Sequence, residues 1–356
     1  MFGNLAVLSV VVLYMAGLFA LALWAERTPA GRRLAGSAPV YALAMAVYCT
    51  SWTFYGSVGS VATTGMLFLT IYLGPTLSAV LWWSILRRMV RIKHRFRITS
   101  IADFIAARYG KCPWVGGLAA LAALAGSVPY IALQVKSIGA TFAIVGLPEG
   151  PAGAWLARHS GLVFMLLLTA FTIVFGGRRL DPTERHPGMV VAVAAQSVVK
   201  LAAFLAAGLC VATMDGHSFS GLLEGMQAGD VRWPGLGTLA GPAAHPYALW
   251  TTYLALAASA ILFLPRQFHV AVVENPDEDH IRTAMWLLPL YLLLINLFVA
   301  PIAVAGMEAG IPPDKADTTV LLLPLLHGRA WLGPLVFLGR SEERRVGKEG
   351  RSRWAP

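Results

Sequence analysis

The chain has 356 residues, of which 57% are hydrophobic and 13% are charged, and its formal net charge is +10. Soluble globular proteins carry about 25% charged residues, so this composition excludes an ordinary soluble domain and indicates an integral membrane protein. Its three cysteines, Cys49, Cys112 and Cys210, lie in or beside apolar segments and have no metal-ligand spacing. The sequence therefore indicates neither a disulfide framework nor a zinc site.

Apolar windows of about 20 residues, the length of a membrane-crossing helix, recur from end to end of the chain. The first has no charged residue before it and no cleavage pattern after Trp24, which predicts a retained anchor. The fourth is long enough to tilt or to kink at Pro129. We predict an all-α protein with eight spans and a ninth, doubtful one: 5–24, 40–59, 66–86, 115–145, 162–175, 189–213, 247–264, 285–305 and 320–338.

Basic residues gather in alternate loops between these windows. They follow the first span at 27–33, the third at 87–111 and the fifth at 178–185, whereas the loops 62–65, 146–160 and 215–246 carry few. By the positive-inside rule, the basic loops lie in the cytoplasm and the N-terminus lies outside. The net positive charge is then a topology signal at the lipid bilayer and does not indicate a nucleic-acid partner.

The second window contains an unusual polar stretch, YCTSWTFYGSVGS, at residues 48–60. Hydrocarbon offers no hydrogen-bond partners to hydroxyl groups or to unwound backbone, so such a stretch faces either a binding site or neighbouring helices. Small and hydroxyl residues that join helices would explain the composition equally well. The segment from Gly56 to Ser60 favours a site, because its glycines permit unwinding and free carbonyl oxygens for a cation.

Two segments at the ends of spans carry local signals. Residues 98–110 predict a short helix with a Thr or Ser cap and Gly110 at its end. Residues 263–269 end a span at Pro265, and His269 by itself is interpreted as a satisfied interfacial residue and not as a ligand.

Two lysines lie within the apolar windows. Lys136 follows Gln134 near the outer end of its span, where it can extend to the headgroups. Lys200 lies in mid-span with Gln196 one turn before it, which indicates either a functional ionisable group or a helix–helix hydrogen bond.

No phosphate-binding loop, metal-ligand cluster or nucleophile elbow is found, so we do not expect this chain to be an enzyme.

Several segments together resemble a known family. A glycine-broken early span, the segment IADFIAARYG and a Gly176-Gly177 turn occur in the order typical of the sodium:solute symporter family. The segments YCTSWTFYGS, RLDPTERH (179–186) and PRQFHV (265–270) resemble most closely the transporter-like N-terminal sensor region of bacterial sensor histidine kinases. The resemblance covers residues 1–339 and implies a multi-pass protein of the bacterial inner membrane. It also implies an amino acid as the solute and a cytoplasmic kinase domain in a longer protein.

The resemblance implies a LeuT-like fold of inverted five-helix repeats, in which the first repeat helix is broken at mid-membrane. Na⁺, as a coupling ion, would bind main-chain carbonyls near Ala46 and Cys49. Some relatives place an aspartate where Tyr48 aligns, so this chain departs from the family at a position that bears on sodium dependence. No organic cofactor is implied. The solute would contact Tyr48, Thr50, Ser51, Trp52, Tyr55, Gln134, Trp250 and Tyr253.

Residues 340–356 read RSEERRVGKEGRSRWAP, where the family continues a helix that supplies sodium ligands. This charged run resembles peptides translated from adapter or vector sequence. It predicts a truncated or misassembled reading frame with an incomplete second repeat, a native tail being the alternative. Three hypotheses follow for the chain: a transport or sensing module, a receptor that binds without transporting, and a structural scaffold or non-functional fragment.

Overall fold

The computed structural model describes residues 4–50, 52–145, 186–213 and 237–326, with single positions between these ranges. Every element in these ranges is helical. Among the described residues, five stretches are long and apolar enough to cross a membrane: Trp52–Trp82, Pro113–Ala132, Pro187–Ala212, Pro246–Phe263 and His280–Glu308. The chain is therefore an α-helical, membrane-spanning protein.

Most of the predicted spans correspond to helices of the structure. The first, sixth and seventh are α1 (Asn4–Arg27), α10 (Pro187–Ala212) and α12 (Pro246–Phe263). The fourth is α8 (Pro113–Val145), which continues through Pro129 as one helix. The ninth begins as α16 (Thr319–Leu326). The predicted span 162–175 is described only at single positions, and residues 327–356, which include the unusual tail, lie outside the described residues.

Two predicted spans are interrupted. The second consists of α3 (Ala38–Met45), the 3₁₀ turn η1 (Ala46–Tyr48), the π-helical turn η2 (Trp52–Gly56) and α4 (Ser57–Thr64). The eighth consists of α14 (His280–Asn296) and α15 (Val299–Glu308), separated at Leu297 and Phe298. The second span is thus broken as predicted, but between η1 and η2. The segment from Gly56 to Ser60, whose glycines predicted unwinding, is helical instead, because glycine permits unwinding without requiring it.

A sharp turn at Gly65 connects the second span to the third. Gly65 has φ +61°, and a Cβ at this position would collide with the Thr238 carbonyl oxygen. Only glycine adopts this conformation freely. The chain then continues through η3 (Gly65–Leu69) into α5 (Thr70–Trp82), which represents the third predicted span.

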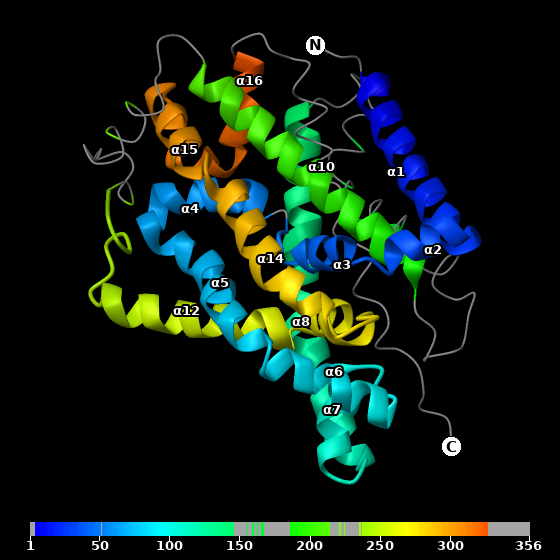
Figure 1. Cartoon of the computed structure of the whole chain (residues 1–356). Helices are drawn as coiled ribbons and strands as arrows, with labels where there is room; N and C mark the ends of the chain where they lie inside the picture. The colour runs from blue at the N-terminus through cyan, green and yellow to red at the C-terminus, as the bar shows by residue number, and fades with distance from the viewer. Residues whose placement is uncertain are drawn as a thin grey trace.

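Figure 1 shows how the broken span is enclosed: α3 lies across α10 and α14, and α4 lies near α15. α1 packs along α10, and α5 packs against α12. The largest fully buried side chains are Trp82 of α5, Tyr41 of α3, Phe54 of η2, Phe204 of α10 and Phe268, which lies between α12 and α14. The break therefore lies inside the helical bundle and not on its surface.

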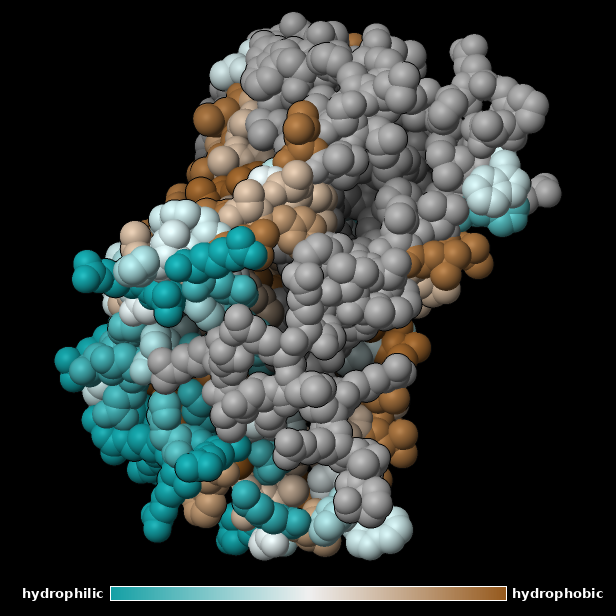
Figure 2. Space-filling view, turned by 90° about the vertical axis from the view of Figure 1, so that its right-hand side faces the viewer, coloured by the Kyte–Doolittle hydropathy of each residue, from teal (hydrophilic) through white to brown (hydrophobic). Residues whose placement is uncertain are grey.

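A basic end of the molecule is formed by α6 (Ile85–Phe96) and α7 (Ile101–Arg108), which lie at the bottom of Figure 1. The Ser100 Oγ accepts the Asp103 N–H at 3.1 Å and caps α7, and Gly110 follows with φ +66°. This confirms the predicted short helix. Hydrophilic residues gather at the lower left of the face in Figure 2, and hydrophobic residues lie above them and along the right-hand side.

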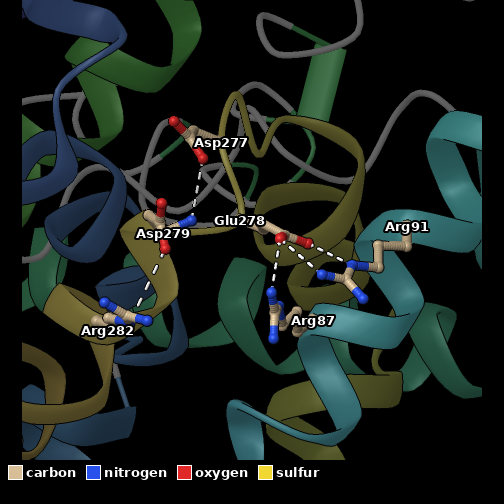
Figure 3. A network of polar contacts seen from close by, with 6 residues as sticks. All are labelled: Arg87, Arg91, Asp277, Glu278, Asp279 and Arg282. Carbon is tan, nitrogen blue, oxygen red and sulfur yellow. Dashed lines mark hydrogen bonds and ion pairs between the residues drawn. The ribbon is translucent and has the colours of Figure 1, made fainter.

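A cluster of charged side chains attaches α6 to the start of α14 (Figure 3). Arg91 donates two hydrogen bonds to the Glu278 carboxylate at 2.6 and 2.9 Å, and Arg87 donates a third at 2.9 Å. The guanidinium groups of Arg87 and Arg282 each lie 4.3 Å from the centre of the Trp83 ring. The hydrogen bonds from Arg91 and Arg87 lower the pKa of Glu278 from 4.5 to about 2.

Apolar side chains cover much of the outer surface. None of the window Pro113–Ala132 of α8 is buried, and it exposes Leu118, Leu121 and Leu124. In water such a surface would be unfavourable by roughly 25 cal/mol per Å², whereas lipid tails are as apolar as these side chains. These residues therefore form the lipid-facing surface.

Candidate functional site

The break in the second span frees backbone groups that the surrounding hydrocarbon cannot satisfy. Backbone and side-chain groups of the same segment satisfy several of them. The Cys49 N–H donates to the Ala46 carbonyl at 2.9 Å, and the Thr50 N–H donates to the Thr53 hydroxyl at 3.1 Å. The Ser57 hydroxyl donates to the Thr53 carbonyl at 2.7 Å. The hydroxyl residues that mark this stretch in the sequence thus support the unwound backbone.

The ammonium group of Lys200 reaches the break from α10. Its Nζ donates to the Cys49 carbonyl oxygen at 2.8 Å, and the residue is only 5% exposed. From the sequence, Lys200 was either a functional group or a helix–helix contact. The structure shows that its ammonium group connects α10 to the broken second span. The Cys49 carbonyl that it contacts belongs to the predicted ion site.

Three tyrosines lie at the break: Tyr48 belongs to η1, Tyr72 to α5 and Tyr291 to α14. Tyr48 donates to the Ile71 carbonyl at 2.8 Å, and Tyr291 of α14 donates to the Ser197 carbonyl at 2.9 Å. The Tyr72 hydroxyl faces Thr53 and Ser57 but has no hydrogen-bond partner of normal geometry among the described residues. Because a buried hydroxyl without a partner costs about 1–3 kcal/mol, Tyr72 indicates a place for a polar ligand or water.

Four of the predicted solute-binding residues lie together because they belong to the break. Tyr48, Thr50 and Tyr55 are buried, and Trp52 is half-buried. The Trp52 indole lies directly over Gly56, where a Cβ would collide with the ring. Ser51 and the side chain of Gln134 lie outside the described residues.

The two predicted solute contacts on α12 lie in different surroundings. The Trp250 ring N–H donates to the Leu239 carbonyl at 2.8 Å, so this indole is attached to the loop before α12. Tyr253 is 43% exposed. The structure therefore does not enclose Tyr253, and it gives Trp250 a role in holding that loop.

The two carbonyl oxygens predicted to bind sodium already accept hydrogen bonds. The Ala46 carbonyl accepts the Cys49 N–H, and the Cys49 carbonyl accepts the Lys200 ammonium. A sodium ion on the Cys49 oxygen would lie beside that ammonium, and two cations a few ångströms apart repel strongly where the dielectric constant is low. In this arrangement the residues do not fit a sodium ion at Cys49.

A second polar cluster lies between α10 and the segment before α14. The Glu274 carboxylate accepts hydrogen bonds from His186 and His269, the rings lying at 3.1 and 3.2 Å. Burial raises the pKa of Glu274, but these hydrogen bonds outweigh it and lower the pKa to about 2. His269 is thus satisfied, as the sequence suggested. The cluster itself was missed, because His186 and Glu274 are 88 residues apart and share no motif.

A scan against protein-family models and a search of curated proteins find no match for this chain. The functional interpretation therefore rests on the residues around the break and on the motifs of the sequence.

Proposed function

We propose that this chain is a transmembrane transport or sensing module, similar to sodium:solute symporters, that binds a small organic solute beside the break between α3 and α4. The observation that carries the proposal is the buried break itself, with the Lys200 ammonium on its freed Cys49 carbonyl at 2.8 Å. Unwound backbone at membrane depth is tolerated where it is buried in protein or lines a site, and broken helices are where transporters bind their substrates.

The chemistry around the break favours an amino acid as the solute. A buried ammonium group attracts a carboxylate, because the charge is screened little at membrane depth. The Tyr72 hydroxyl has no hydrogen-bond partner of normal geometry in the described part of the chain, so it offers a further hydrogen bond. Aromatic rings at Phe54 and Phe204, with centres 5.2 Å apart, supply an apolar wall of the kind that holds a side chain.

Within this proposal, α3 and α4 are the two halves of the first helix of a LeuT-like inverted repeat. The basic end at α6 and α7 lies in the cytoplasm and the N-terminus outside, by the positive-inside rule, in a bacterial inner membrane. The motifs RLDPTERH and PRQFHV support a role as the sensor region of a longer histidine kinase, with its kinase domain in the cytoplasm. The proposal gives this chain no catalytic step and no nucleic-acid partner.

Sodium is not part of the proposed binding mode, because the Lys200 ammonium already takes the Cys49 carbonyl. We therefore expect solute binding to be the same in sodium and in choline chloride. Sodium-stimulated binding would show that the ammonium leaves the carbonyl and that the family's coupling ion binds there.

The experiment is direct binding of radiolabelled amino acids to the purified chain in detergent, followed by uptake into proteoliposomes. We expect saturable binding of one amino acid or of a related group. The Trp52→Ala variant should bind about tenfold or more weakly, a loss of about 1.4 kcal/mol, because the indole lies over the break. Binding without net uptake would identify the receptor version of the proposal.

The matched control is Trp286→Ala on α14, whose side chain is 59% exposed on the outer surface and should not affect binding. The proposal fails if the folded wild-type chain binds no amino acid. It also fails if Trp52→Ala and Trp286→Ala bind equally well, since Trp52 would then have only a structural role.

A further inference from the structure

Two segments that are far apart in the sequence converge on one carboxylate at the N-terminal end of α10. His186 precedes Pro187 and occupies the cap position of α10. His269 begins the π-helical turn η4 (His269–Val273), which follows the short helix α13 (Pro265–Phe268). Glu274 is the next residue after η4. The motifs RLDPTERH and PRQFHV thus each contribute one imidazole to the same place.

The three side chains present their ligand atoms to one another at close range. One Glu274 oxygen, Oε1, lies 3.1 Å from His186 Nδ1 and 3.2 Å from His269 Nε2. All three ligand atoms lie within 4.8 Å of one another. Tetrahedral zinc has bonds of about 2.0–2.2 Å, which hold its ligand atoms about 3.4 Å apart. Small side-chain rotations are therefore enough to admit an ion.

The remaining contacts orient the carboxylate. The backbone N–H of His186 donates to the second oxygen, Oε2, at 3.1 Å, and the Glu274 N–H donates to the His269 carbonyl at 2.9 Å. Groups that hold the ligands in this way are typical of metal sites, where they fix ligand orientation and raise affinity. The Oε1 atom is left facing both rings.

The site is mostly buried, and only one side of it is accessible to solvent. The Glu274 side chain is 2% exposed and the His269 side chain 11%, whereas the His186 side chain is 38% exposed. A metal ion would enter from the His186 side, and a water molecule would complete the coordination there. Two imidazoles and one carboxylate with an open position are a ligand set that Zn²⁺ favours.

We propose that His186, His269 and Glu274 form a Zn²⁺ site that ties the N-terminal end of α10 to the η4 segment. The site is independent of the solute proposal, since it uses none of the residues at the break. Because α10 also carries Lys200, the ion would fix the helix that holds the Cys49 carbonyl.

The test is zinc titration of the full chain in detergent, after treatment with a chelator, in competition with a zinc-binding dye. We expect one high-affinity Zn²⁺ per chain. His186→Gln and His269→Gln should each lower the affinity at least tenfold, and the double variant should remove the site. The matched control, His94→Gln, changes an exposed histidine of α6 and should leave the affinity unchanged.

X-ray absorption at the zinc edge gives a second measurement that needs no variant. The expected spectrum has two imidazole ligands and oxygen ligands without sulfur. A wild-type chain that binds no stoichiometric zinc overturns the proposal, as does a sulfur ligand from a cysteine. Equal affinity in the wild type and in both histidine variants would also overturn it, because zinc would then bind elsewhere.

Discussion

Lys200 is the residue on which the interpretation of the break depends. An ammonium group at membrane depth is costly unless it has partners, and it marks a functional position by default. Here it lies 2.8 Å from a carbonyl that a broken helix has freed. One side chain therefore satisfies the Cys49 carbonyl and places a positive charge beside the break, where the proposed solute would bind.

The variant Lys200→Met tests whether the Lys200 ammonium occupies the position at the Cys49 carbonyl that a sodium ion would otherwise take. Without it the Cys49 carbonyl is open to sodium, so we expect sodium chloride to raise the Tm of the variant by about 2–4 °C over choline chloride. The wild-type Tm should be the same in both salts. Thermal unfolding in detergent measures this, with the exposed Lys315→Met as control. An equal response to sodium in wild type and Lys200→Met would contradict the assignment.

The helices differ in how far local sequence specifies them. α7 was predicted with its cap, because the Ser100–Asp103 hydrogen bond and Gly110 are neighbours in the chain. A break in the second span was also predicted, but it was expected between Gly56 and Ser60, which is helical, whereas the helix ends after Tyr48. α6 was read only as part of a basic loop, since its salt bridges join Arg87 and Arg91 to a glutamate 191 and 187 residues away.

The stability that the charged cluster between α6 and the start of α14 provides should depend on pH. Glu278 has a folded pKa of about 2 against an ordinary value of 4.5, so the folded state binds the proton less readily than the unfolded state does. The contribution to stability is present above pH 4.5 and is lost as the pH falls toward 2. Because the ion pair is exposed to solvent, the effect is small and is screened by salt.

The comparison of wild type with Glu278→Gln measures this contribution. We expect a lower Tm for the variant at pH 6 and a difference that shrinks as the pH falls below 4.5. Asp277→Asn in the same loop is the control, since its carboxylate only accepts the Asp279 N–H. A Tm difference that stays constant between pH 6 and pH 3 would show that the charge of Glu278 is not what holds α6.

At the scale of the whole molecule, the basic end and the apolar outer surface define how the protein lies in a bilayer. The arginines of α6 form its polar end, and α8 exposes apolar side chains between Pro113 and Ala132. Cys112 lies at the basic end, in the short connection between α7 and α8, and is partly exposed, whereas Cys49 and Cys210 are buried. Labelling of the exposed Cys112 can therefore show which side of the membrane the basic end faces.

A membrane-impermeant thiol reagent should label Cys112 only from the cytoplasmic side. We expect labelling in inverted vesicles of a bacterial host and none in intact spheroplasts, with Cys112→Ser as the unlabelled control. Strong labelling of intact spheroplasts would reverse the proposed orientation and place the basic end outside.

The sequence by itself determined the class of the protein, most of its spans and which span is broken. These are properties of contiguous residues, because hydrophobic length, loop charge and polar residues within an apolar window are read locally. Only the tertiary structure decided which side chain contacts the break and which residues form the second polar cluster. Lys200 meets Cys49 across 151 residues, and His186 meets Glu274 across 88, because contacts between helices depend on packing that no local pattern contains.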